Sequence, residues 1–274
     1  MAETTTTTKD QIVPVNQRMT SHQTLASLYG VDIMAAASSS ALVSPFIAIV
    51  DRAIIENANG KRKLGQGLIQ GFQTLFTQPH KFVGSIQYRL IFGLYFGTYM
   101  TANMVETTCE QRSVDHVTSS WIKFLATTAV NMSVCIYKDR AFTRMFGVSA
   151  VKPLPLLSYL FFATRDSMTV AASFIAPPIV SKALQEKEWS EDHAKVAAQL
   201  SCPAAVQFFS TPLHLLGLDL YNRPAATVGQ RAGLIRSLYF KTTLARCARI
   251  GPAFGIGGVG NTYFRSYREK ILEN

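Results

Sequence analysis

The chain has 274 residues and a formal net charge of +10, with 48% hydrophobic and only 16% charged residues. Soluble domains carry about a quarter charged residues, so this composition favours a membrane protein over a soluble one. The positive charge fits phospholipid headgroups or an anionic solute, whereas dispersed basic residues without a zinc-finger, homeodomain or RNA-binding signature exclude nucleic acid as a partner.

Residues 1–22 are predicted to form a disordered polar tail. They contain a threonine run from Thr4 to Thr8, together with Glu3 and Asp10, and they have no apolar core. We therefore expect neither a secretory signal nor an arginine-rich mitochondrial presequence in this segment.

The first long apolar stretch extends from Leu25 to Ile55. It exceeds the roughly 20 residues that cross a bilayer, and Pro45 is expected to kink it. The basic loop Lys61-Arg62-Lys63 follows, and then residues 64–76 place apolar side chains at helical spacing. That segment is too short to span and is predicted to lie at the membrane interface, before a second span over residues 83–105.

The rest of the chain predicts four further spans. The third covers residues 117–146, the fourth ends near Pro177-Pro178, the fifth covers 194–220 and the sixth covers 242–263. A short amphipathic segment at 229–239 precedes the last span. The predicted fold is an all-α membrane protein with six tilted transmembrane helices and short interfacial helices.

Two series of residues recur with the same period. Arg89, Arg165 and Arg249 each open a hydrophobic segment, at intervals of 76 and 84 residues. In phase with them, a proline or serine precedes a charged residue seven positions later: Pro45 and Arg52, Ser133 and Arg140, Pro212 and Asp219. Repetition of this kind predicts three pseudo-symmetric repeats, at 23–112, 113–190 and 191–274, around a central cavity.

This organisation resembles the mitochondrial carrier family, whose odd-numbered helices carry Pro-x-[Asp/Glu]-x-x-[Lys/Arg]-x-[Lys/Arg]. In that family the proline kinks the helix, and the acid and base form a ring of salt bridges that gates the cavity. The acid positions are here Ile47, Cys135 and His214, so the usual three-pair network is not expected. The remnants of the motif are Pro45, Arg52, Ser133, Lys138, Arg140, Pro212 and Asp219.

The resemblance also implies where a solute binds. Arg89, Arg165 with Asp166, and Arg249 fall on the family's three contact positions on the even-numbered helices. A guanidinium group binds carboxylate or phosphate through two parallel hydrogen bonds and stays charged. Asp166 would accept a substrate ammonium group or pair with Arg165. The alternative is that these arginines lie at the interfacial ends of the spans.

Two functions are compatible with these features. The first is a transporter of a small anionic metabolite, such as an amino or keto acid, across the mitochondrial inner membrane, with the outer membrane as the alternative location. The second is a scaffold, assembly factor or complex subunit that retains the fold without transport, which the eroded gate motif favours. The expected partners are a small anionic solute, membrane lipids such as cardiolipin, and possible protein subunits.

Other motifs carry no chemistry. The glycines at 255–260 match a dinucleotide-binding spacing, but they lie inside an apolar span and are expected to permit close helix packing. The four cysteines form no CxxC pair, which predicts neither a disulfide framework nor a zinc site. The histidines share no ligand spacing. We therefore expect no metal, no cofactor and no enzymatic activity.

Overall fold

The computed structural model describes residues 22–146 and 153–272, and this part of the chain is helical without a strand. The predicted tail at 1–22 lies outside the described residues, apart from His22. The elements are α1 (His22–Ala58), α2 (Leu64–Thr77), α3 (Pro79–Val83), α4 (Ile86–Gln111), α5 (His116–Phe146), α6 (Leu156–Phe174), α7 (Ala176–Gln185), α8 (Glu191–Asn222), α9 (Val228–Ala248), the π-helix η1 (Pro252–Gly258), α10 (Val259–Arg265), the 3₁₀-helix η2 (Ser266–Arg268) and α11 (Glu269–Leu272).

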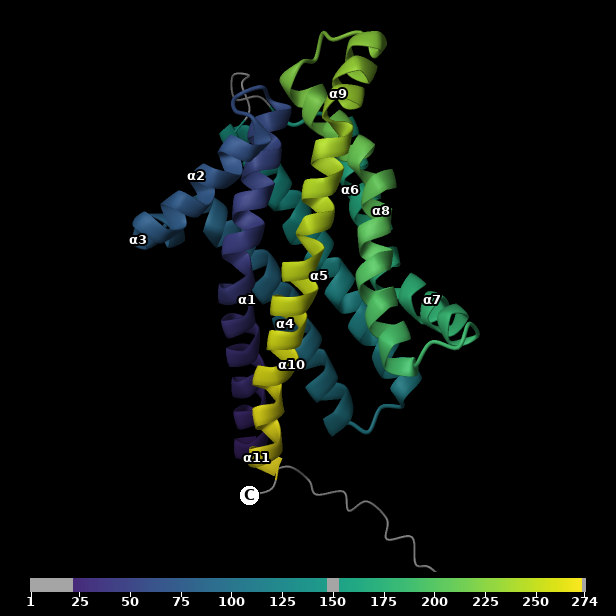
Figure 1. Ribbon diagram of the computed structural model, residues 1–274. Helices are drawn as coiled ribbons and strands as arrows, with labels where there is room; N and C mark the ends of the chain where they lie inside the picture. Colours follow the sequence, from purple (N-terminus) through teal and green to yellow (C-terminus); the bar gives the residue numbers. More distant parts are fainter. Residues whose placement is uncertain (1–21, 147–152, 273–274) are drawn as a thin grey trace, which may run out of the picture.

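The long helices form a closed ring in chain order (Figure 1). Each of α1, α4, α5, α6, α8 and α9 packs on the next, and η1 and α10 return to pack on α1. The short helices α2 and α3 project from the ring beside α1, and α7 projects on the opposite side (Figure 1). The ring brings residues from distant parts of the chain to one central axis.

Glycines allow close approach within this ring. A Cβ atom on Gly257 would lie 2.3 Å from the Tyr99 hydroxyl, so a larger residue would have to displace Tyr99 where η1 meets α4. A Cβ atom on Gly71 would lie 2.5 Å from the Ile49 side chain, so α2 is held tightly against α1. The expectation that the glycines at 255–260 serve helix packing is confirmed at Gly257.

Most of the segments that were expected to be helical are helical, and α2 covers the segment predicted at residues 64–76. The end of the chain differs from the prediction. α9 passes through the expected break between residues 239 and 242, because no proline or glycine interrupts residues 234–248. α9 ends at Ala248 with Arg249 as its C-cap, and η1 begins shortly afterwards at Pro252, which lacks a backbone N–H. Pro177 and Pro178 likewise occupy the first turn of a separate helix, α7.

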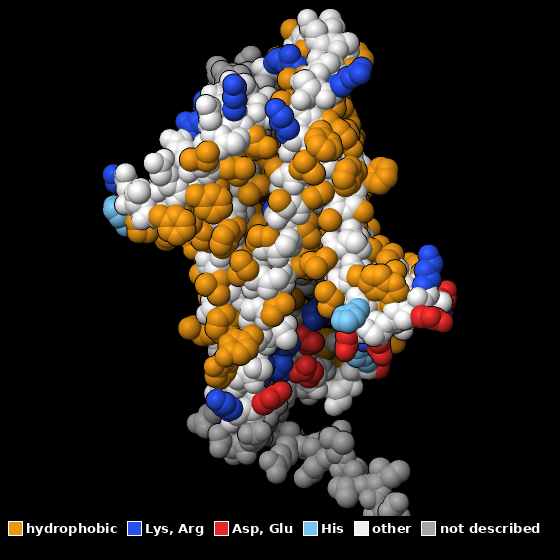
Figure 2. Space-filling view, in the orientation of Figure 1, with side chains coloured by type: hydrophobic (Ala, Val, Ile, Leu, Met, Phe, Trp, Pro, Cys, Tyr) orange, Lys and Arg blue, Asp and Glu red, His pale blue; other side chains and the backbone are white. Residues whose placement is uncertain are grey.

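The outer surface of the ring is apolar. Figure 2 shows hydrophobic side chains over the middle of the molecule, with lysines and arginines toward both ends and acidic side chains in the lower part. Phe209 and Met34 are 70% and 65% exposed. Two stretches, Thr24–Ala58 and Leu156–Gln185, are long and apolar enough to cross a membrane. Contiguous exposed apolar surface of this kind suits lipid rather than water.

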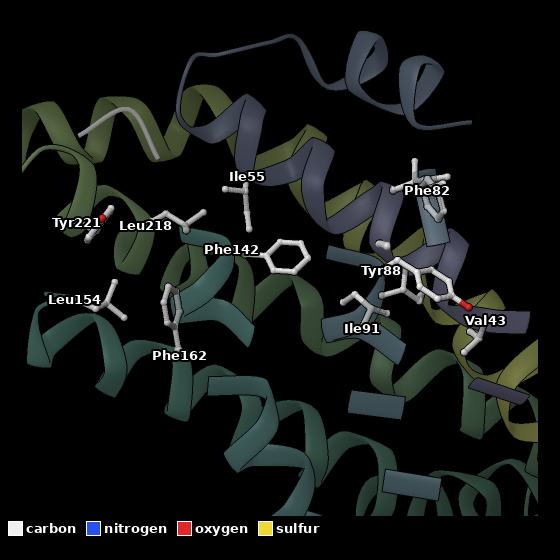
Figure 3. Close-up of a cluster of buried hydrophobic side chains, with 13 residues drawn as sticks. Val43, Ile55, Phe82, Tyr88, Ile91, Phe142, Leu154, Phe162, Leu218 and Tyr221 are labelled. Atoms are coloured by element: carbon white, nitrogen blue, oxygen red, sulfur yellow. The ribbon is translucent and has the colours of Figure 1, made fainter. Parts of the chain in front are cut away.

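A buried apolar cluster closes the ring toward the C-terminal end of α1 (Figure 3). Phe142 of α5 lies at its centre and, like Phe162 of α6, is fully buried. We call the surrounding side chains the apolar plug, which comprises Ile55, Phe142, Leu154, Phe162, Leu218 and Tyr221. Its members come from α1, α5, α6, α8 and the segment before α6, and they pack closely between these helices.

Candidate solute-binding site

A buried aspartate joins three parts of the ring. Asp51 lies on α1, two turns before that helix ends, and only 6% of its side chain is exposed. Its Oδ2 accepts a hydrogen bond from Lys138 Nζ of α5 at 2.9 Å, and its Oδ1 accepts one from Arg249 Nη1 at 2.6 Å. Arg249 caps the C-terminus of α9. One carboxylate therefore ties the first helix to the middle and the last part of the chain.

The same chain of ion pairs continues into α6. Lys138 Nζ also lies 2.9 Å from Asp139 Oδ1, and Asp139 Oδ2 accepts from Arg165. Arg165 Nε donates to Asp166 Oδ1 at 2.8 Å. We call this chain the central network; its members are Asp51, Lys138, Asp139, Arg165, Asp166 and Arg249.

His214 of α8 completes the contact with the fourth side of the ring. Arg165 Nη1 lies 2.8 Å from His214 Nδ1. An arginine can only donate, so Nδ1 must be the acceptor and the ring proton must lie on Nε2. His214 is therefore the neutral tautomer, and it offers its Nε2–H as a donor.

Buried charges of this kind are stable only when they are paired. Moving an ion from water into the protein interior costs several kcal/mol, so a buried charge without a partner can disrupt a fold. The space between the charged side chains is about 10 Å³ and is lined by Asp51, Lys138, Asp139, Arg165, His214, Arg246 and Arg249. This volume corresponds to about one water molecule. The described conformation is therefore closed at this level.

Arg246 differs from the other cations that line this space. It lies on α9, one turn before Arg249, and its residue surface is only 2% exposed. Its Nη2 donates to Ser210 Oγ at 3.2 Å, and its Nε has no hydrogen-bond partner. Within residues 22–146 and 153–272, no acidic side chain forms an ion pair with it.

Cys135, Asp139 and Asp166 bring three possible metal-ligand atoms within 4.8 Å of one another. Arg165 already contacts all three, since it bonds to both carboxylates and its Nη2 lies 3.8 Å from Cys135 Sγ. The guanidinium group therefore supplies the positive charge that a metal ion would bring to this cluster.

A second set of charges lies toward the N-terminal end of α1. Arg265 Nε of α10 donates to Asp32 Oδ1 at 2.9 Å, and Arg265 Nη1 pairs with Glu106 of α4. Lys123 Nζ of α5 lies 2.9 Å from Glu106 Oε2. We call Asp32, Glu106, Lys123 and Arg265 the distal network. Asp32 and Asp51 are 19 residues apart on α1, which corresponds to about 28 Å of helix, close to the thickness of a bilayer's hydrocarbon core.

The structure brings three of the four predicted solute-binding residues together. Arg165, Asp166 and Arg249 belong to the central network. Arg89 does not, because it lies on the first turn of α4 with its side chain exposed. The three arginines therefore do not occupy equivalent positions in the ring, contrary to the expectation.

The motif remnants are dispersed. Lys138 belongs to the central network, Arg52 pairs with Glu56 at 2.8 Å, and Asp219 pairs with Arg223 and Arg231 at 2.6 and 2.5 Å. Ser133 and Arg140 are exposed on α5. Pro45 and Pro212 lie inside α1 and α8, which continue through them.

The acid positions of the motif, Ile47, Cys135 and His214, form no three-pair network, but buried ion pairs form from acids at other positions. The acids lie one position before the last base of the motif rather than at the motif's own acid position. Asp51-Arg52 and Asp139-Arg140 repeat at an interval of 88 residues, and this signal could have identified both acids. His214 and Arg246 carry no comparable signal, because their importance depends on the side chains that surround them.

A family model described as a probable citrulline exporter matches residues 35–268. The chain belongs to this family. The matched region begins within α1 and ends in η2, so it contains the whole central network. No curated protein and no solved structure matches the chain.

The family assignment corrects the resemblance to mitochondrial carriers. The shared features were prolines and arginines at periodic positions, and these recur wherever kinked helices surround a polar interior. The chain is accordingly a membrane protein of an exporter family that handles a small metabolite, and it is not an enzyme.

Proposed function

We propose that the chain exports citrulline, or an amino acid of closely similar chemistry, and that the central network is its solute site. Citrulline carries an α-carboxylate, an α-ammonium group and a neutral ureido side chain. The central network offers cations and carboxylates side by side in a buried position, which suits a zwitterion better than a simple anion. This juxtaposition carries the proposal.

We further propose six membrane crossings, made by α1, α4, α5, α6, α8 and the continuous stretch from α9 to α10. Support comes from the closed ring, in which the last helix packs against the first. Arg52, Arg140 and Asp219 occupy α1, α5 and α8 at intervals of 88 and 79 residues, which agrees with three repeats. The domain boundaries at 112 and 190 fall between α4 and α5 and between α7 and α8.

The two networks suggest how transport proceeds. The central network and the apolar plug close one end of the ring, and the distal network joins α1, α4, α5 and α10 toward the other. A space of about 10 Å³ cannot hold an amino acid, so the two ends must open in turn. The π-helix η1 lies between the arginines of the two networks, and such irregular turns are frequent at hinges and functional sites.

Exchange of ion pairs would keep the free-energy cost of this opening small. As the network opens, the solute carboxylate can pair with a cation that lines the central space. The solute ammonium group can likewise pair with one of the carboxylates of the network. Each charge then stays paired in a low-dielectric interior, where an unpaired one costs several kcal/mol. A solute without both charged groups would leave one side of the opened network unpaired, so the proposal predicts selectivity for zwitterions.

The alternative function, a scaffold without transport, drew its support from the missing gate acids. The described residues supply those charges at other positions, and the family is one of exporters. Location in a mitochondrial membrane depended largely on the carrier resemblance and stays a prediction. Protease protection of the protein in intact and osmotically swollen mitochondria would place it in the inner or the outer membrane, or in neither.

The test of function is efflux from proteoliposomes preloaded with radiolabelled citrulline. The wild-type protein should release the label, and external zwitterionic amino acids should compete more strongly than acetate or methylamine. Asp139→Asn should abolish efflux, since it leaves Lys138 and Arg165 short of one partner. Glu191→Gln is the matched control, because its pair with Lys195 is exposed and contributes little. Label that stays inside wild-type liposomes under every gradient would refute the proposed function.

A further inference from the structure

The cationic side chains around the central space are not equivalent. Arg165 is held by Asp139 and Asp166, and Arg249 is held by Asp51. Arg246 lines the same space but forms no ion pair with any acid in the described parts of the chain. An arginine remains charged even when buried, so it cannot escape this situation by losing its proton. The site therefore contains one positive charge without a counter-charge.

The groups around Arg246 are also short of partners. Thr242 and Thr243 precede it by about one turn on α9, and neither buried hydroxyl makes a hydrogen bond. His214 lines the same space and presents its Nε2–H as a donor. Buried polar groups in native proteins are nearly always satisfied, so the unpartnered Nε–H of Arg246 indicates a missing acceptor.

We propose that Arg246 is the receptor for the carboxylate of the transported solute. This inference deepens the proposed function and rests on it, since the solute is taken to be an amino acid. Arg246 has a free Nε–H and is the one cation lining the space that does not have to give up an aspartate to bind an anion. Asp166 Oδ2 is buried without a partner as well, and it is the acceptor available to the solute's ammonium group.

A merely structural arginine would behave differently from a receptor. Removing a partnered buried charge strands its partner and destabilises the protein, whereas removing an unpartnered one relieves a desolvation cost. Arg246→Gln should therefore raise the unfolding temperature of the solute-free protein while weakening solute binding. Arg165→Gln should lower the unfolding temperature, because Asp166 would lose its counter-charge and Asp139 would keep only Lys138.

The decisive experiment compares two ligands on purified full-length protein. Citrulline and citrullinamide differ only in that the amide has lost the carboxylate charge. The dissociation constant of each is measured by thermal stabilisation or calorimetry for wild type, Arg246→Gln and Arg246→Lys. Arg236→Gln is the matched control, since Arg236 lies on the same helix with its side chain exposed.

Wild type and Arg236→Gln should prefer citrulline by about tenfold to a hundredfold, the range expected for hydrogen bonds to a charged group. Arg246→Gln should bind the two ligands within about threefold of each other. Arg246→Lys should keep the preference but bind citrulline about tenfold more weakly, because an ammonium group lacks the bidentate fork.

Three results would overturn the inference. The first two leave the proposed function intact, and the third contradicts it as well. If Arg246→Gln retains the full preference for citrulline, another residue holds the carboxylate and the proposed function survives. If Arg246→Gln does not fold, an unchanged citrulline affinity in Arg246→Lys leads to the same conclusion. If wild type binds neither ligand nor any related amino acid, the proposed function falls together with the inference.

Discussion

Replacing Asp51 by asparagine tests whether the central network holds the ring together. The substitution keeps the shape of the side chain but removes the charge that accepts from Lys138 at 2.9 Å and from Arg249 at 2.6 Å. Breaking a buried ion pair by removing one partner costs about 3–5 kcal/mol. Lys138 keeps Asp139, whereas Arg249 loses its one ion pair among the described residues, so most of the loss should come from Arg249.

The assay is equilibrium unfolding of the detergent-solubilised protein, read by tryptophan fluorescence or circular dichroism. Asp51→Asn should lose about 3–5 kcal/mol, and the double variant Asp51→Asn with Arg249→Gln should recover at least about 1 kcal/mol of it, since no charge is then stranded. Asp219→Asn serves as the comparison, because it also breaks a buried pair but lies outside the central space. If Asp51→Asn unfolds within about 0.5 kcal/mol of wild type, the electrostatic reasoning is wrong.

Three further predictions concern packing, topology and capping. Gly257→Ala should destabilise the protein by about 1–3 kcal/mol in the same unfolding assay, because the new Cβ would lie 2.3 Å from the Tyr99 hydroxyl. In a cysteine-free background, Lys61→Cys and Lys187→Cys should react with an impermeant maleimide from opposite sides of the membrane, since their loops lie at opposite ends of the ring. Asp115 accepts hydrogen bonds at the start of α5, which hold the pKa of its carboxyl below the usual value. Its cap should therefore protect the first amides of α5 from hydrogen exchange at neutral pH and should fail as the pH falls through that lowered pKa.

Each of these predictions has a control and a contrary outcome. Gly260→Ala is the packing control, because its Cβ would meet Ser39 at an ordinary 3.6 Å, and equal effects at both glycines would contradict the tight contact. Labelling of both cysteines from one side would rule out the proposed crossings. Asp115→Ala should remove the pH dependence of the protection factors, which are exchange rates corrected for the intrinsic rate at each pH, and unchanged protection in that variant would show that the carboxylate does not cap α5.

The fold could be predicted where a physical requirement acts locally. The first span follows from an apolar stretch longer than a bilayer requires, and α2 follows from apolar residues spaced for one helical face. The continuous α9 was missed because a change from polar to apolar residues was interpreted as a break. A backbone without proline or glycine has no reason to stop there, and polarity alone does not end a helix.

The site could be predicted only in part. Arg165 and Arg249 stood out because charges are rare at bilayer depth. Asp51 was not predicted because the carrier motif has its acid at position 47, one helical turn before Asp51. Arg246 could not be found from the sequence. Its distinguishing property is the lack of a counter-charge, and this depends on which residues of α5, α6 and α8 surround it.

The central claim, that an amino acid binds within the central network, is tested most directly by a native thiol. Cys135 Sγ lies 3.8 Å from Arg165 Nη2. In a variant that keeps Cys135 but replaces the other three cysteines by serine, a small membrane-permeant thiol reagent should modify Cys135 whenever the ring opens. Saturating citrulline should slow this modification, whereas Cys202, tested in the equivalent single-cysteine variant, should react at the same rate with or without it. If citrulline stabilises the protein but leaves the rate at Cys135 unchanged, the solute binds elsewhere and the account of the central network is contradicted.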